Sequence, residues 1–124
     1  MIPEGVIRLK LRQAWSLRSS TRWTEDSPAR GQCGETSLVV QDCFGGDILK
    51  TRLPDGRWHF YNRIDGRRFD FTDAQCEAPI VYCDQPASRP EAFADTNGAQ
   101  YRYLLGEMQR VLASDKTSTH GRNG

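Results

Sequence analysis

The sequence predicts an α+β domain in which a small antiparallel β-sheet packs against an N-terminal, a central and a C-terminal helix. Three observations carry this prediction: apolar residues at helical spacing early in the chain, alternating aromatic residues around a tight turn, and a final helical segment. The chain has 124 residues, which fits one domain. We place that domain at residues 1–113. Residues 114–124 contain no large apolar side chain and are predicted to form a disordered polar tail.

Apolar residues at helical spacing predict three helices. The first covers residues 4–17, and a polar loop at residues 19–31 follows it. The second covers residues 33–44 and is the central helix, because Gly45-Gly46 supplies the left-handed residue that commonly ends a helix. The third covers residues 99–112.

The sheet is predicted from alternating aromatic residues and from turn signals. Asp65-Gly66 is a two-residue hairpin signal, and Pro54-Asp55-Gly56 marks a second turn. A capping-box pattern opens a short helical turn at Thr72, and residues 86–98 are rich in turn formers, so we expect a linker there. The predicted strands are residues 47–52, 58–64, 67–71 and, as a shorter element, 80–83.

Composition excludes several classes of protein. The longest charge-free apolar stretch is six residues, 78–83, whereas a membrane span needs about 20. Charges near the start leave no signal peptide, so we expect a soluble, cytoplasmic protein with no membrane partner. The four cysteines contain no C-x₂-C pair, which favours free thiols over a zinc site; we expect no metal and no cofactor.

A cysteine, a histidine and an aspartate stand where the predicted elements bring them together. Cys33 begins the central helix, where free backbone N–H groups and the helix dipole favour a thiolate. A turn at Asp65-Gly66 pairs Tyr61 with Asp70. Side chains alternate along a strand, so Asp70 then lies diagonal to His59 on one face, with roughly 5–8 Å between their Cβ atoms. The register alone therefore predicts a His–Asp pair.

Each of the three side chains has a chemical role in a thiol site. The carboxylate of Asp70 would orient the imidazole of His59, and the other ring nitrogen would face the thiol of Cys33. Asn62 is the rival orienting group, since some thiol enzymes use asparagine. It points to the opposite face of the sheet, so we prefer Asp70. A different turn would shift the register and favour Asn62 instead.

Residues beside the cysteine offer auxiliary roles. Backbone N–H groups at the start of the helix would stabilise an oxyanion, and Gln32 would add a side-chain donor. Gly31 and Gly34 would leave room for a substrate. Glu35 is interpreted as a first-turn acid favoured by the helix dipole, on the face away from Cys33.

Plainer interpretations exist for each of these residues. A lone cysteine is most often a small buried hydrophobe, and we assign Cys43, Cys76 and Cys83 that kind of role. The arginines around the predicted hairpin, interleaved with aromatic residues, resemble a basic surface for nucleic acid. Seventeen basic against sixteen acidic residues make that partner unlikely, and recognition of an anionic substrate uses the same charges equally well.

A series of short motifs runs through the chain: Gly31-Gln32-Cys33, TSLVVQD at residues 36–42, Gly45-Gly46, HFYN at residues 59–62 and FDFT at residues 69–72. This series resembles the YunG-like family of small bacterial proteins over residues 5–112. The resemblance names a family without naming a reaction.

More distantly, the Cys–His–Asp order resembles the papain-like and transglutaminase-like superfamily, whose members hydrolyse or transfer acyl groups through a thioester. That resemblance implies a papain-like minimal core, with Cys33 as nucleophile, His59 as base and Asp70 as orienting acid. Gly34 stands where transglutaminases commonly have tryptophan, and only Gln32 can replace the glutamine that papain-like enzymes carry upstream.

The sequence thus predicts a cysteine-dependent hydrolase or acyl transferase that acts on an amide or ester in a small molecule or peptide. The alternative is a non-catalytic binding or interaction module on the same scaffold.

Overall fold

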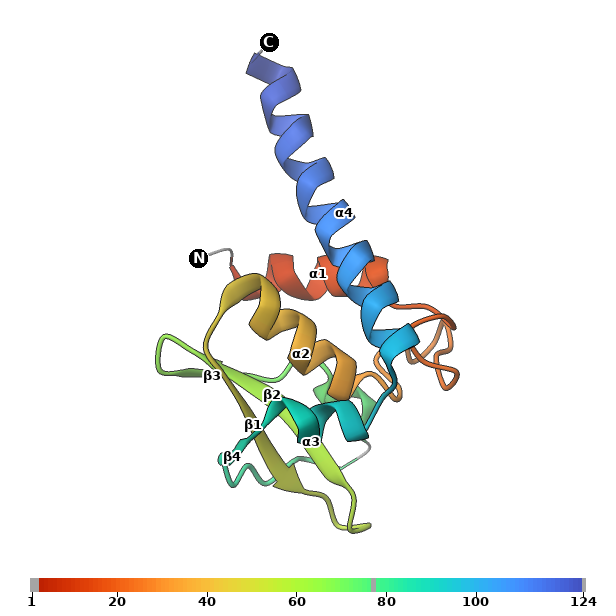
Figure 1. Ribbon diagram of the computed structural model, residues 1–124, viewed down its shortest axis with the longest axis vertical. Helices are drawn as coiled ribbons and strands as arrows, with labels where there is room; N and C mark the ends of the chain where they lie inside the picture. The colour runs from red at the N-terminus through yellow and green to blue at the C-terminus, as the bar shows by residue number, and fades with distance from the viewer. Residues whose placement is uncertain (1–2, 77, 124) are drawn as a thin grey trace.

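The computed structural model describes residues 3–76 and 78–123. The fold is α+β, as predicted, with a four-stranded antiparallel sheet in the order β3-β2-β1-β4. In Figure 1, α4 runs from beside α2 out of the body of the domain. The helices are α1 (Glu4–Ala14), α2 (Cys33–Phe44), α3 (Arg89–Ala94) and α4 (Gly98–Asn123), with a 3₁₀ turn at Asp73–Gln75. The strands are β1 (Asp47–Arg52), β2 (Trp58–Ile64), β3 (Arg67–Phe69) and β4 (Gln85–Ala87).

Two apolar clusters hold the helices against the sheet. The larger joins α1, α2 and α4 to the β2–β3 hairpin, and the smaller joins α2 and α3 to β1 and β2. Helix α2 contributes to both, because its buried residues cover more than one face. The N-terminal end of α2 is therefore fixed against the sheet. The larger cluster includes Ile7, Leu11, Val39, Val40, Ile64, Phe69, Leu104 and Met108; the smaller is Cys33, Leu38, Ile48, Phe60 and Ala92.

The β2–β3 hairpin has the predicted register. Asp65 and Gly66 both have positive φ, 52° and 77°, which is the conformation that a two-residue hairpin turn requires. Arg63 pairs with Arg68, and Ile64 pairs with Arg67. Strand β3 ends at Phe69, two residues before the predicted end. The prediction that the turn sets the position of the following residues is confirmed.

The segment from residue 80 to residue 98 differs from its prediction. Residues 80–83 are not a strand: Thr51 on β1 binds this segment through its hydroxyl, which donates to the Val81 carbonyl oxygen at 2.8 Å and accepts from the Cys83 N–H at 3.1 Å. The strand is β4, which pairs with β1 just downstream. The predicted linker at 86–98 was wrong, because it contains α3, which is capped by the side chain of Ser88.

The helix boundaries also differ at two places. Helix α1 ends at Ala14, because Trp15 has extended backbone angles. Helix α4 continues past the predicted end at residue 112 to Asn123, and no proline interrupts that stretch. The disorder predicted for residues 114–124 stays a prediction. Within the described ranges, no helix combines the length and the apolar character that a membrane span requires.

Candidate active site

Cys33 is the first residue of α2 and lies at the wall of a cavity of about 770 Å³. The cavity lies between the loop that precedes α2, the turn between β1 and β2, and residues 76 and 78–81, which follow the hairpin. Cys33 is 7% exposed and is therefore nearly buried at this wall.

His59 lines the same cavity from β2 and is otherwise completely buried. Its Nε2 atom lies 2.7 Å from Oδ2 of Asp70, which is itself 6% exposed. The sequence predicted this contact from the hairpin register, and the distance confirms that the two side chains meet. Nε2 is thus the ring nitrogen that faces the carboxylate.

Asp70 is held through both carboxylate oxygens. The backbone N–H of Thr72 donates to Oδ1 at 3.2 Å, and the hydroxyl of Tyr82 donates to Oδ2 at 2.8 Å. Burial raises the pKa of Tyr82, with the Asp70 charge adding to the effect, so this hydroxyl stays a donor. A carboxylate oriented from two sides fixes the imidazole that it contacts. Tyr82 was not among the sequence candidates, because residues 80–83 were predicted as a strand without a role.

Asn62 lies on the opposite face of β2 from His59. Its side-chain amide donates to the Ser37 carbonyl oxygen at 3.0 Å and thereby ties β2 to α2. Gln32 is completely buried, and neither polar atom of its side chain has a hydrogen-bond partner among the described residues. Gln32, the predicted auxiliary donor, and Asn62, the rival orienting group, are both outside the cavity lining.

Asp95, which sequence reasoning missed, contacts the cysteine directly. The Cys33 thiol donates to Oδ2 of Asp95 at 3.2 Å, and the backbone N–H of Gly34 donates to the same oxygen at 3.1 Å. A Cβ atom added at Gly34 would lie 2.7 Å from that oxygen. The space beside Gly34, predicted to admit a substrate, is thus filled by Asp95; that prediction was wrong for this conformation. Gly31 has a positive φ of 71° instead, which explains a glycine there by backbone conformation.

The Asp95 carboxyl has a perturbed electrostatic environment. Burial raises its pKa, and the hydrogen bonds from Cys33 and Gly34 lower it by less. The charges of His59 and Arg57 also lower it, which places both within electrostatic range of the carboxyl that contacts the thiol. Asp95 lies just after α3, in the segment predicted as a linker, so no sequence signal connected it to Cys33.

Glu35 does lie in the first turn of α2, as predicted, but it is completely buried. Burial raises the pKa of this carboxyl to about 8, and the neighbouring Asp95 charge acts in the same direction. Hydrogen bonds with its own backbone N–H and with Thr96 lower the pKa, but by less than burial raises it. Glu35 is therefore a largely protonated carboxyl at neutral pH rather than a dipole-stabilised carboxylate.

The other three cysteines occupy different environments, and all four are free thiols. Cys43 packs against the larger apolar cluster, and burial raises the pKa of its thiol. Cys76 lines the cavity and has a pKa raised by burial, whereas Cys83 is exposed. Among the residues that the structure describes, no group of three His, Cys, Asp or Glu side chains is arranged to hold a metal ion.

These observations define an α+β protein in which a cysteine at a helix N-terminus and a buried histidine line one cavity, and the histidine contacts Asp70. The chain belongs to the YunG family, since the family model described as YunG protein matches residues 5–113. It is 50% identical over 113 residues to "Uncharacterized protein YunG" of Bacillus subtilis (strain 168), an alignment that covers 91% of this chain and 97% of the relative. No solved structure matches the chain, so the papain-like core stays a prediction.

Proposed function

We propose that this protein is a cysteine-dependent hydrolase or acyl transferase that acts on an amide or ester through a thioester. The observation that carries the proposal is the buried contact between His59 and Asp70, 2.7 Å, together with the cavity that both His59 and Cys33 line. A histidine oriented by a carboxylate beside a cysteine is the arrangement that activates a thiol for nucleophilic attack.

In the proposed reaction, Sγ of Cys33 forms a bond to the carbonyl carbon of the substrate. The thiol proton passes to the imidazole of His59, while Asp70 stabilises the resulting imidazolium. The imidazolium then protonates the leaving amine or alcohol as its bond to the acyl carbon breaks, which leaves a thioester on Cys33. Water or an acceptor amine, deprotonated by His59, attacks that thioester and releases the acyl product and the free thiol.

Asp95 defines the resting state in this proposal. Its carboxyl group accepts the thiol hydrogen bond and also occupies the backbone N–H of Gly34, which lies in the first turn of α2. A substrate carbonyl that displaces Asp95 would receive the Gly34 N–H as an oxyanion donor. In the resting state the thiol thus donates to Asp95, and a substrate that enters the cavity would displace this contact.

The second candidate is a non-catalytic binding module on the same scaffold. It is favoured by the 7% exposure of Cys33 and by the thiol contact with Asp95, because both restrain a nucleophile. For either function we propose a cytoplasmic location, which agrees with four cysteines that remain free thiols.

Acylation by p-nitrophenyl acetate tests the proposal against this second candidate. We expect a burst of nitrophenol that matches the amount of protein, with the acetyl group mapped to the Cys33 peptide by mass spectrometry. His59→Gln should remove the burst, and Cys33→Ser should remove both the burst and the label. Circular dichroism of each variant shows whether the fold persists.

The exposed Cys83 serves as an internal control for ordinary thiol acylation. If Cys33 is acylated no faster than Cys83, or if His59→Gln retains the burst in a folded variant, the proposed function is wrong. A folded protein without a burst is the result that the binding module predicts.

A further inference from the structure

The lining of the cavity is rich in arginine. Among the residues that the structure describes, four arginines contribute to it, against two carboxylates, Asp55 and Asp95. One of these carboxylates, Asp95, is engaged by the thiol and by a backbone N–H, as described above. The excess of positive charge in the lining contrasts with the whole chain, whose net charge is only +1. The four arginines are Arg22, Arg30, Arg52 and Arg57.

Three of these arginines form no ion pair with a carboxylate of the described residues. Arg22 and Arg30 lie on the loop between α1 and α2, and neither forms an ion pair with a described residue. Arg52 stacks its guanidinium 4.1 Å from the centre of the Trp58 ring and donates to the Gly56 carbonyl oxygen at 2.8 Å. It is thus held in place by neutral groups, which leaves its charge available to a ligand.

Arg57 has a carboxylate partner that a ligand can replace. Its Nε donates to Asp55 at 2.7 Å, but the two side chains are 59% and 51% exposed. An ion pair this exposed contributes little to stability and exchanges readily with another anion. Arg22 also acts on Asp55, since its charge helps to lower the pKa of that carboxyl after the hydrogen bonds from Arg57. The two loops therefore bring their charges together across the cavity.

The positive charge reaches the reactive end of the cavity. Arg57 lies within electrostatic range of Asp95, which in turn contacts the Cys33 thiol at 3.2 Å. The lining also contains apolar side chains that an apolar group could contact: Leu53, Pro54, Trp58, Ile80 and Val81. A bound molecule would meet cations on one side and apolar surface on the other.

We propose that the cavity selects acyl compounds that carry an anionic group, a carboxylate or a phosphate, next to an apolar portion. The anion would pair with Arg57, Arg22 or Arg30 while the acyl carbon lies at Sγ of Cys33. This inference rests on the proposed function and names its class of substrate. Pairing of guanidinium with carboxylate or phosphate is the geometry that arginine favours.

Two alkylating reagents of nearly equal size test the charge preference. Iodoacetate is anionic and iodoacetamide is neutral, and each transfers its methylene carbon to a thiolate with loss of iodide. We measure both rates at Cys33 and at the exposed Cys83 by peptide mass spectrometry on the full chain. The ratio of the iodoacetate rate to the iodoacetamide rate should be about tenfold higher at Cys33, at the low end of electrostatic steering.

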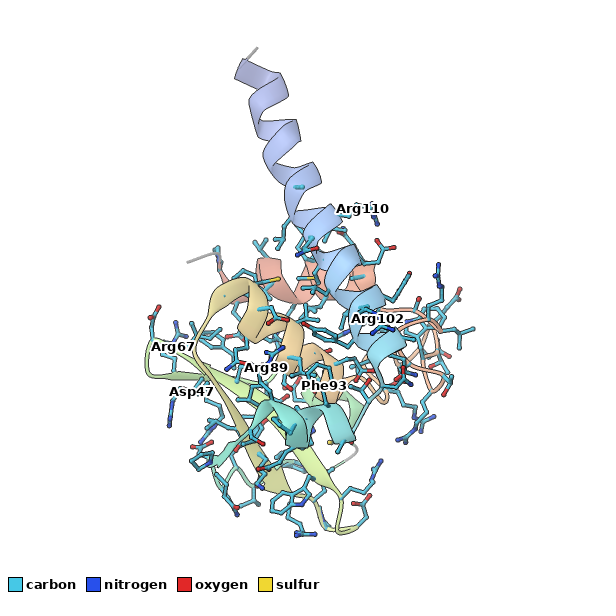
Figure 2. All side chains as sticks on the ribbon, in the orientation of Figure 1. Asp47, Arg67, Arg89, Phe93, Arg102 and Arg110 are labelled. Carbon is cyan, nitrogen blue, oxygen red and sulfur yellow. The ribbon has the colours of Figure 1, made fainter. Side chains whose placement is uncertain are left out.

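Variants and competing anions locate the preference. Arg22→Gln with Arg30→Gln, and separately Arg57→Gln, should bring the ratio at Cys33 toward that at Cys83. Arg67→Gln is the matched control, because Arg67 lies on the β2–β3 hairpin and outside the cavity lining (Figure 2). Protection of Cys33 by inorganic phosphate, compared with protection by benzoate, distinguishes a phosphate from a carboxylate ligand.

The outcomes separate this inference from the proposed function. If Cys33 reacts well with iodoacetamide but shows the same ratio as Cys83, the anion preference is wrong and the thiol site stands. If the ratio is high but Arg67→Gln lowers it as much as the lining variants do, the effect belongs to the whole molecule and the assignment to this cavity is wrong. If Cys33 reacts with neither reagent, both the proposed function and this inference are wrong.

Discussion

Replacing Glu35 with glutamine should stabilise the fold by an amount that grows with pH. In the wild type, this completely buried carboxyl lies in the first turn of α2 beside Asp95, and burial raises its pKa to about 8. Ionising it at high pH places an unpaired charge in the interior, which is costly. Glutamine has nearly the same shape and no charge to acquire, so the variant escapes that cost.

The magnitude follows from the two pKa values, the ordinary 4.5 and about 8 in the fold. A carboxyl whose pKa is raised by folding does not reduce stability when the pH is below its pKa in the unfolded chain. Stability is lost as the pH rises from that pKa toward the pKa in the folded protein. The loss is under about 1 kcal/mol at pH 5, about 3 kcal/mol at pH 7 and about 5 kcal/mol at pH 9. Any cost of burying the amide is the same at every pH.

Urea denaturation of both proteins at pH 5, 7 and 9 measures this difference. We expect the free energy of unfolding of Glu35→Gln, relative to wild type, to rise by about 2–3 kcal/mol between pH 5 and pH 7. Glu25→Gln, on the exposed loop before α2, is the control and should follow the wild type. A difference between Glu35→Gln and wild type that stays constant from pH 5 to pH 9 would refute the reasoning.

Three further predictions concern the surroundings of the site. Asp95→Asn should speed alkylation of Cys33 by iodoacetamide several-fold at pH 7, since it removes a carboxyl 3.2 Å from the thiol; a slower rate would contradict the resting-state role. Asn62→Ala should lower the free energy of unfolding in urea by about 1–3 kcal/mol, because the Ser37 carbonyl loses its donor; a change under about 0.5 kcal/mol would argue against that tie. Removal of residues 114–124 should leave the thermal unfolding midpoint within a few degrees of the full chain, and a larger fall would show that this part of α4 stabilises the domain.

The sequence was most informative where a local signal fixes the geometry. The Asp65-Gly66 turn requires positive φ at both residues, and only one register follows from it. From that register, Asp70 was predicted to lie next to His59 and Asn62 on the opposite face. Both predictions hold, although β3 itself ends before Asp70. The helical spacing before Gly45 likewise placed Cys33 at the start of α2.

The rest of the site depends on contacts between segments far apart in the chain. Asp95 reaches Cys33 because α3 packs near α2, and no pattern in residues 86–98 encodes that packing. The Ser88-x-x-Glu91 pattern is a helix-start signal that points to α3, but the prediction of a linker over residues 86–98 did not use it. The burial of Glu35 could not be predicted from the sequence, because an acid in the first turn of a helix is normally solvated and only tertiary packing covers it.

The most direct test of the central claim is the pH profile of Cys33 alkylation by iodoacetamide in wild type, Asp70→Asn and Asn62→Ala. If Asp70 orients His59 and stabilises its charged form, Asp70→Asn should lower the Cys33 rate near pH 6 by at least about tenfold, the equivalent of one charge-assisted hydrogen bond. Asn62→Ala should keep the wild-type profile, because its amide lies on the other face of the sheet. Identical profiles for wild type and a folded Asp70→Asn, or a loss confined to Asn62→Ala, would contradict the account.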